Sequence, residues 1–228
     1  IPAFGIPLNM LCLFVIWRCW KPPTVQKTLL FFVCGNNLVT CFYGLPFTAF
    51  DQYHPIDKPA NFCTFHAYAY FLLQAYSILV LFMVTLNRYF VIVIPTSKIF
   101  TFGGTTRTVI IAFVTLFLQM SILIPPAIGV WGSLGYEHST GSCVLVSANE
   151  GGDSSYNLLG SICAFALPFI SMLLCYLHIF FVVRRQNCKV LQGNLFGAGK
   201  EQQRRKQELR LLTTTFGMIL LFVVTYLP

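Results

Sequence analysis

The sequence predicts an all-α membrane protein, a bundle of helices that crosses the lipid bilayer several times. Three observations support this prediction: a hydrophobic composition, long uncharged runs, and basic residues gathered on one side of the membrane. Of 228 residues, 56% are hydrophobic and only 10% are charged. A soluble domain carries roughly a quarter of charged residues to cover its surface. The composition therefore excludes an ordinary soluble domain.

The few charged residues leave six long uncharged runs, at residues 1–17, 28–50, 59–87, 108–136, 154–183 and 211–228. A helix needs about 20 apolar residues to cross ~30 Å of hydrocarbon. Four runs are long enough, and the first and last reach the ends of the chain. We expect one transmembrane domain over residues 1–228. Its helices are predicted at about residues 1–18, 28–50, 63–95, 107–131, 155–183 and 207–228.

The basic residues set the predicted orientation. If the first helix ends inside, 14 of the 15 Lys and Arg lie on the inner side, and only Lys58 lies outside. The positive-inside rule assigns that inner side to the cytoplasm. A basic face of this kind attracts anionic lipid head groups. We therefore expect membrane lipids, and no nucleic acid, among the partners.

Arg88 ends the uncharged run 59–87, within the sequence Leu86-Asn87-Arg88-Tyr89. A lone Arg at such an edge commonly snorkels toward the head groups. Two residues at characteristic spacings from Arg88 favour a more specific role: Cys63 lies 25 residues before it, and Pro95 lies seven residues after it.

With these spacings the whole chain resembles the rhodopsin-like (class A) G-protein-coupled receptors. In that family the third helix opens with a cysteine and closes with an Asp-Arg-Tyr type triplet, as Cys63 and Asn87-Arg88-Tyr89 do here. Three further pairs match the family on the other helices: Asn9 and Asn37, Pro168 and Tyr176, and Phe222 and Pro228. The resemblance implies a multi-pass plasma-membrane receptor with a seven-helix bundle. Here we expect that bundle to be truncated to about six helices, with the first and sixth incomplete and the seventh missing.

The departures from the family pattern matter as well. Asn37 takes the place of the second-helix acid that helps to hold a sodium ion, with Ser77 where a second ligand would be. A neutral amide cannot compensate a buried cation, so we expect no bound metal and no cofactor. Asn87 replaces the acid of the triplet, and Asn-Arg-Tyr looks most like the melatonin-receptor and Moody-type branches. Tyr226 takes the place of the Trp usual in the sixth helix.

Two of the nine cysteines, Cys63 and Cys143, fall on the outer, oxidising side. The resemblance implies a disulfide between them, which would tether the loop between the fourth and fifth helices over the bundle. Two free thiols are the alternative. The other cysteines fall in apolar or cytoplasmic stretches, where we expect packed thiols.

The ligand class is predicted from the third helix. Receptors for biogenic amines place an Asp 18 residues before the triplet Arg, and here that position is Tyr70, which disfavours an amine held in that way. Helical spacing groups several neutral side chains on one face of this helix. We predict a ligand-binding set formed by Tyr70, Phe71, Gln74 and Tyr226. Such a site suits an uncharged or amphiphilic ligand, small or lipid-like. Packing within the bundle is the alternative role for these aromatic residues.

The resemblance implies that ligand binding is transmitted to a cytoplasmic heterotrimeric G-protein. Arg88 would pair with Glu208 at rest and be released toward Tyr176 when the sixth helix moves outward. The predicted coupling set is Asn87, Arg88, Tyr89, Tyr176, Glu208, Phe222 and Pro228, with Asn9, Asn37 and Pro168 in structural roles. Prolines remove backbone hydrogen bonds and permit local bending.

Other functions fit the sequence less well. The sequence contains no Ser-His-Asp set, glycine-rich phosphate loop or paired carboxylates, so we expect no enzyme. A non-signalling channel or transporter is a rival, although a voltage-gated channel needs an Arg-rich helix and a filter loop, which are missing. A light-sensing opsin-type receptor stays open, because its retinal Lys would lie in the missing seventh helix.

Overall fold

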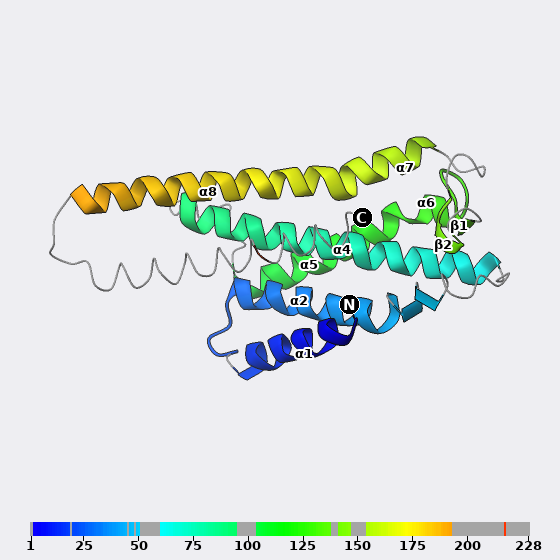
Figure 1. Ribbon diagram of the computed structural model, residues 1–228, viewed down its shortest axis with the longest axis horizontal. Helices are drawn as coiled ribbons and strands as arrows, with labels where there is room; N and C mark the ends of the chain where they lie inside the picture. Colours follow the sequence, from blue (N-terminus) through cyan, green and yellow to red (C-terminus); the bar gives the residue numbers. More distant parts are fainter. Residues whose placement is uncertain are drawn as a thin grey trace. The chain divides into compact units, whose positions relative to one another are not determined.

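The computed structural model describes residues 2–18, 20–44, 46–47, 49–50, 60–94, 104–137, 141–146, 154–192 and 217. These residues are mostly helical, with one short antiparallel hairpin (Figure 1). The chain divides into two compact units, Ile1–Met172 and Leu173–Pro228. The first unit contains the helices and the hairpin that position the candidate site.

The first unit begins with two helices that pack side by side, α1 (Pro2–Arg18) and α2 (Val25–Val39) (Figure 1). Thr24 caps α2, since its hydroxyl accepts a hydrogen bond from the Lys27 N–H at 3.3 Å. At its other end α2 continues into η1 (Thr40–Gly44), a π-helical turn. Such turns widen the backbone locally and often occur at functional sites.

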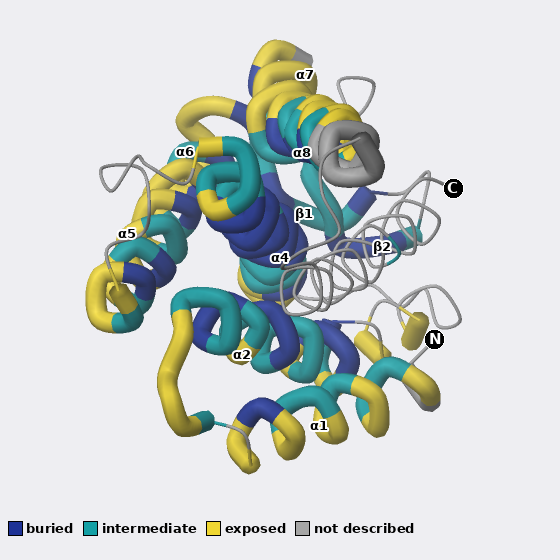
Figure 2. Tube along the Cα trace, turned by 90° about the vertical axis from the view of Figure 1, so that its left-hand side faces the viewer, coloured by how far each residue is buried: buried dark blue, intermediate teal, exposed yellow. Residues whose placement is uncertain are grey.

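The central element of the first unit is α4 (Ala60–Val93), a helix of 34 residues. At 1.5 Å per residue it is about 51 Å long, which exceeds the ~30 Å hydrocarbon core. α4 packs against α2 and against α5 (Thr105–Ile122). Tyr68 and Tyr76 donate hydrogen bonds to the Met120 and Ala112 carbonyls of α5, at 2.9 and 3.2 Å. Figure 2 shows α4 as largely buried, whereas α1 and α5 expose one side.

α5 ends at Ile122, earlier than the residue 131 that the sequence suggests. The reason is the pair Pro125-Pro126, which lies in the short helix α6 (Ile124–Ala127). Proline has no N–H, so a continuous helix would lose two hydrogen bonds, those to the carbonyls of Ser121 and Ile122.

A small hairpin follows, which the sequence analysis did not predict. Strand β1 (Leu134–Glu137) pairs with β2 (Ser142–Leu145), and Tyr136 lies opposite Cys143 in the antiparallel register. Gly141 leads into β2 with a φ of +64°, a conformation that favours glycine.

The last described helices are α7 (Ser154–Ser161) and α8 (Leu167–Gln192), joined by the π-helical turn η3 (Ile162–Ala166). The Leu167 N–H donates to the Ile162 carbonyl, five residues back, and Pro168 follows at once without an N–H to donate. The second unit begins within α8, so its described part consists of residues 173–192 and Gly217.

Three helical stretches among the described residues are long and apolar enough to cross a membrane: Asn61–Val93, Thr105–Ala127 and Ser155–Arg185. Phe4–Arg18 is a shorter apolar helix. Large apolar side chains are exposed along them, such as Phe117 at 64% on α5. A surface of this kind is stable against lipid rather than water, which agrees with the composition.

Candidate functional site

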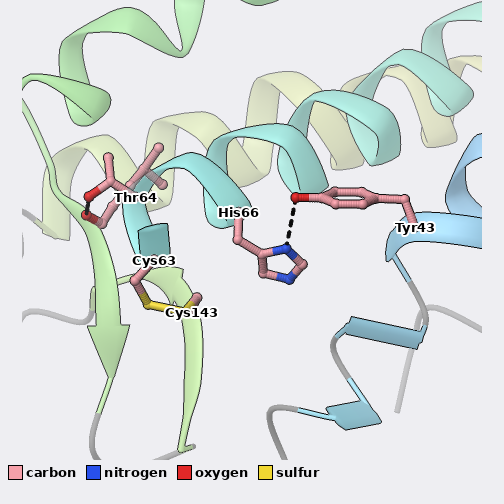
Figure 3. The surroundings of a disulfide bond; sticks show 6 residues. Tyr43, Cys63, Thr64, His66 and Cys143 are labelled. Atoms are coloured by element: carbon pink, nitrogen blue, oxygen red, sulfur yellow. Dashed lines mark hydrogen bonds between the residues drawn. A yellow bond between two sulfur atoms is a disulfide. The ribbon is translucent and has the colours of Figure 1, made fainter. Parts of the chain in front are cut away.

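The outer end of α4 is joined covalently to the hairpin. A disulfide links Cys63 to Cys143 on β2, with Cα atoms 5.1 Å apart, which confirms the predicted pairing (Figure 3). Both cysteines are buried, in a cluster with Ala67 and Leu134. The bond therefore forms the centre of a small apolar core between α4 and the hairpin.

Hydrogen bonds from two helices hold the same hairpin. The Thr64 hydroxyl on α4 donates to the Leu134 carbonyl on β1 at 3.0 Å (Figure 3). The Asn157 amide on α7 donates to the Val146 carbonyl just beyond β2, also at 3.0 Å. With the disulfide, these contacts attach the hairpin to α4 and α7 at separate points.

A buried histidine lies one turn further along α4. His66 is 1% exposed, and its Nδ1 lies 3.1 Å from the Tyr43 hydroxyl of η1 (Figure 3). Which of the two donates depends on the imidazole tautomer. The rings of Phe47 and Phe62 pack against the imidazole. No sequence motif marks this cluster, because its members come from separate helical segments.

Tyr70 and Phe71 follow on α4, and both make packing contacts. Their rings meet edge to face with centroids 5.9 Å apart. The Tyr70 ring also lies over Gly44, where an added Cβ would be 3.4 Å from the tyrosine Cδ2. Phe71 packs against the apolar cluster around the disulfide. The proposed ligand contacts of these two residues stay predictions, and packing accounts for part of each ring.

Gln74 lies one turn further inward on α4 and differs from its neighbours. Its side chain is only 3% exposed, and within the described part of the chain neither its amide nitrogen nor its amide oxygen has a hydrogen-bond partner. Leaving a buried polar group unsatisfied costs about 1–3 kcal/mol. Among Tyr70, Phe71 and Gln74, the predicted ligand residues that the structure describes, Gln74 is the one whose buried polar atoms have no hydrogen-bond partner in the described part of the chain.

A network of neutral polar groups connects α2 and α4 just below Gln74. The Asn36 amide donates to the Ser77 hydroxyl at 2.6 Å and to the Leu73 carbonyl at 2.9 Å. The Ser77 hydroxyl in turn donates to Asn37 Oδ1 at 3.4 Å. Ser77 and Asn37 are thus neighbours, as the spacing suggested, while Asn36 was missed. Two consecutive amides in an apolar helix were the available signal, since such residues bond across helices.

The inner end of α4 carries the Asn-Arg-Tyr triplet. Asn87 and Arg88 are buried, at 6% and 8% exposed. A snorkelling cation keeps its head group among water and lipid head groups, and the burial of Arg88 differs from that arrangement. Tyr89 lies edge to face with Phe90, their centroids 5.7 Å apart.

The other predicted residues are distributed as follows. Asn9 donates to the Gly5 carbonyl within α1 at 2.8 Å. Pro168 lies at the start of α8, and Tyr176 lies further along α8, in the second unit. The contact of Tyr176 with Arg88 on activation stays a prediction, as does the structural role of Pro168. Four predicted residues lie outside the described part of the chain: Glu208, Phe222, Tyr226 and Pro228.

Apolar spanning helices, a disulfide at the outer end of the central helix and a buried Arg at its inner end define a multi-pass membrane receptor. The pattern of the 7 transmembrane receptor (rhodopsin family) matches residues 8–228, and the chain belongs to this family. The family and the apolar helices make it a multi-pass protein of the plasma membrane.

Several individual receptors are similar to the chain. G protein-coupled receptor 161 of Bos taurus is 30% identical over 189 residues, which cover 81% of this chain and 34% of that protein. G-protein coupled receptor moody of Drosophila pseudoobscura pseudoobscura is 26% identical over 182 residues, 79% of this chain and 26% of that protein. Melanopsin-B of Xenopus laevis is 25% identical over 231 residues, 100% of this chain and 43% of that protein. The chain thus spans less than half the length of these relatives.

Proposed function

We propose that this chain is the signalling bundle of a receptor that binds an extracellular ligand and activates a cytoplasmic heterotrimeric G-protein. The observation that carries the proposal is the pair of buried polar side chains on α4, Gln74 in its middle and Arg88 near its inner end. They lie 14 residues apart, about 21 Å along the helix axis. One rigid helix therefore connects a ligand-facing amide with the triplet that characterises the family.

The proposed ligand is uncharged or amphiphilic. An amide offers one acceptor oxygen and two donor hydrogens, so a ligand group that both donates and accepts would satisfy Gln74. The sequence of α4 contains no Asp or Glu, and Arg88 is its one charged residue. Within α4 nothing would pair with an ammonium group, and the position where amine receptors carry an Asp is Tyr70. These features favour a neutral polar group on an otherwise apolar ligand.

The proposed transmission is a shift between two arrangements of one bundle. A ligand can shift such an equilibrium only by its difference in affinity for the two states. At rest Arg88 pairs with Glu208, and in the active state it is released and a cleft opens for the G-protein. The outer end of α4, held by the disulfide, supplies a fixed reference for that motion.

The test is basal nucleotide exchange by a co-expressed G-protein in membranes that contain the complete receptor. Arg88→Ala should remove exchange, because the proposed active state needs the released Arg88 side chain to turn toward Tyr176 and open the cleft for the G-protein, and alanine has no group that can do so. Arg107→Ala is the matched control, since Arg107 is an exposed cation near the same predicted face. Equal exchange by the Arg88→Ala and Arg107→Ala receptors at equal surface expression would refute the coupling role.

A light receptor is the second candidate, favoured by the similarity of the whole chain to Melanopsin-B. The measurement is the absorption spectrum of the complete receptor after incubation with 11-cis-retinal. A stable visible band that bleaches on illumination would establish the opsin function. Its absence, together with unchanged basal exchange under illumination, would leave the ligand receptor.

A further inference from the structure

Two cysteines outside the receptor site meet between α1 and α2. The Cys34 thiol donates to the sulfur of Cys12 with the two sulfur atoms 2.8 Å apart. Neither cysteine is in a disulfide. Cys12 is half-buried, whereas Cys34 is buried, with 6% of its surface exposed. Cys12 is therefore the more exposed of the two thiols, and Cys34 is the more buried.

The pair is part of a close seam between the two helices. Gly5 lies seven residues before Cys12 on α1, and Cys41 lies seven residues after Cys34, in the π-helical turn η1 that continues α2. A Cβ added to Gly5 would lie 2.6 Å from the Cys41 sulfur, so the helices also approach closely there. Seven residues are two helical turns, which keeps both contacts on one face of each helix. Small side chains are the usual means of such close packing in membranes.

We propose that Cys12 and Cys34 are an oxidisable dithiol, a modification site at which peroxide forms a reversible disulfide between α1 and α2. A disulfide bond is about 2.05 Å long, so the sulfurs need to approach by about 0.8 Å from their observed separation. The seam already holds the two sulfur atoms within hydrogen-bonding distance of each other. Cys41 faces Gly5 rather than a thiol, so it has no equivalent partner on α1.

The reaction proceeds in two balanced steps. The Cys12 thiolate attacks one oxygen of hydrogen peroxide, the O–O bond breaks, and a sulfenic acid and hydroxide form, the latter taking up the thiol proton as water. The Cys34 sulfur then attacks the sulfenic sulfur, the S–O bond breaks, and the oxygen leaves as a second water with the Cys34 proton. Two thiols and one peroxide become one disulfide and two waters.

The difference in exposure assigns the two roles. The thiol less covered by the protein is the one that peroxide reaches first, so half-buried Cys12 is assigned the sulfenic acid and buried Cys34, next to it, the resolving role. Cys12 lies six residues before Arg18, about 9 Å from the end of α1 that the charge pattern places in the cytoplasm. Hydrogen peroxide is small and uncharged and can enter an apolar seam. A small uncharged thiol that enters the seam would reverse the modification by thiol–disulfide exchange.

The experiment treats the complete receptor in detergent micelles with hydrogen peroxide. The sample is then denatured, all remaining thiols are alkylated with N-ethylmaleimide, and the peptides are analysed by mass spectrometry. Cys12 and Cys34 should lose alkylation together, at least fivefold, while a peptide pair that contains both cysteines appears and disappears on treatment with dithiothreitol. Cys41 and Cys175 in the same molecules are the reference thiols and should keep their alkylation.

Two variants sharpen the assignment. In Cys34→Ser the crosslink cannot form, and Cys12 should be trapped as a sulfenic acid by dimedone. In Cys41→Ser the crosslink should form at the rate of the unmodified receptor. Cys12 and Cys34 that stay as alkylatable as Cys41 would overturn the proposal, as would a crosslink of Cys34 to Cys41. The time course in the unmodified receptor decides the question even where a variant fails to fold.

Discussion

The two ends of α4 are built in different ways. The outer end is covalently bound to the hairpin through Cys63–Cys143, and the Thr64 hydroxyl bonds the same hairpin. The inner end carries the buried side chains of Asn87 and Arg88, with no cysteine near them in the sequence. The predicted partners of that inner end, Glu208 and Tyr176, come from much later in the chain.

A helix with one fixed end and one end that can change partners is suited to a two-state conformational switch. A covalent bond and hydrogen bonds to nearby elements fix one end of a helix, so that end cannot exchange partners at low cost. A buried Arg can exchange one carboxylate or hydroxyl partner for another, and each exchange is worth a few kcal/mol. We therefore expect substitutions at the outer end to change stability, and substitutions at the inner end to change signalling.

The largest effect should come from Cys143→Ser. Removing a native disulfide typically costs about 2–5 kcal/mol, and the 80-residue separation of Cys63 from Cys143 favours the upper part of that range. The midpoint of thermal unfolding and the surface expression of the receptor should both fall. Cys163→Ser, at an exposed free cysteine in η3, is the control and should change neither. An unchanged unfolding midpoint for Cys143→Ser would remove the contrast between the two ends.

A smaller change in stability is expected when Gln74 or Asn36 is replaced. Gln74 on α4 is buried and Asn36 on α2 is half-buried, and both are amides in the middle of the same helix pair. Gln74→Leu removes an amide that has no hydrogen-bond partner within the described part of the chain. It should stabilise the ligand-free receptor by about 1–2 kcal/mol. Asn36→Leu removes the hydrogen bonds to Ser77 and Leu73, and should destabilise it by about 1–3 kcal/mol.

In one thermal-unfolding assay, Gln74→Leu should raise the unfolding midpoint and Asn36→Leu should lower it. Both changes replace an amide by an apolar side chain on facing helices, so hydrophobicity alone would shift both in the same direction. A loss of stability for Gln74→Leu as large as that for Asn36→Leu would mean that Gln74 is already hydrogen-bonded in the ligand-free receptor. The proposed ligand contact would then lose its main support.

Much of the fold could be predicted from the sequence, because lipid imposes a simple rule. Long uncharged runs must become helices, and the charges between them mark the ends. The hairpin of residues 134–145 could not be predicted, because its strands are only four residues long and depend on the disulfide and on bonds from α4 and α7. The end of α5 could have been predicted from Pro125-Pro126, which interrupt the helical hydrogen bonds.

The placement of candidate site residues was predictable where it depends only on their spacing along one helix. Cys63, Gln74 and Arg88 all lie on α4, and their positions follow from helical periodicity and the family resemblance. Contacts between helices were harder to predict, because consecutive residues differ by a rotation of about 100°, and this rotation decides which of two neighbours faces the partner helix. Asn36, rather than Asn37, makes the shorter bond to Ser77 for this reason. The Cys12–Cys34 contact was missed in the same way.

The smallest effect concerns the proposed restraint on Arg88 at the inner end. An aspartate before this Arg would supply a neighbouring negative charge, and Asn87 does not. Glu208 should then be the main acidic restraint. At 4 Å and an effective dielectric of 20 the Coulomb attraction is about 4 kcal/mol, before the cost of desolvation is subtracted. Even a net ~1.4 kcal/mol would change a small active fraction roughly tenfold.

Glu208→Gln in the complete receptor should therefore raise basal nucleotide exchange by up to about tenfold. Asn87→Asp should lower it, because the new carboxylate would add a second attraction that holds Arg88 in the resting state. Glu201→Gln is the control, since it removes the other acid of the same cytoplasmic stretch. Unchanged exchange by Glu208→Gln at equal surface expression would mean that Glu208 does not restrain Arg88. Arg88 would then be a buried residue held by other contacts, and the inner end of α4 would not be the mobile counterpart of the outer one.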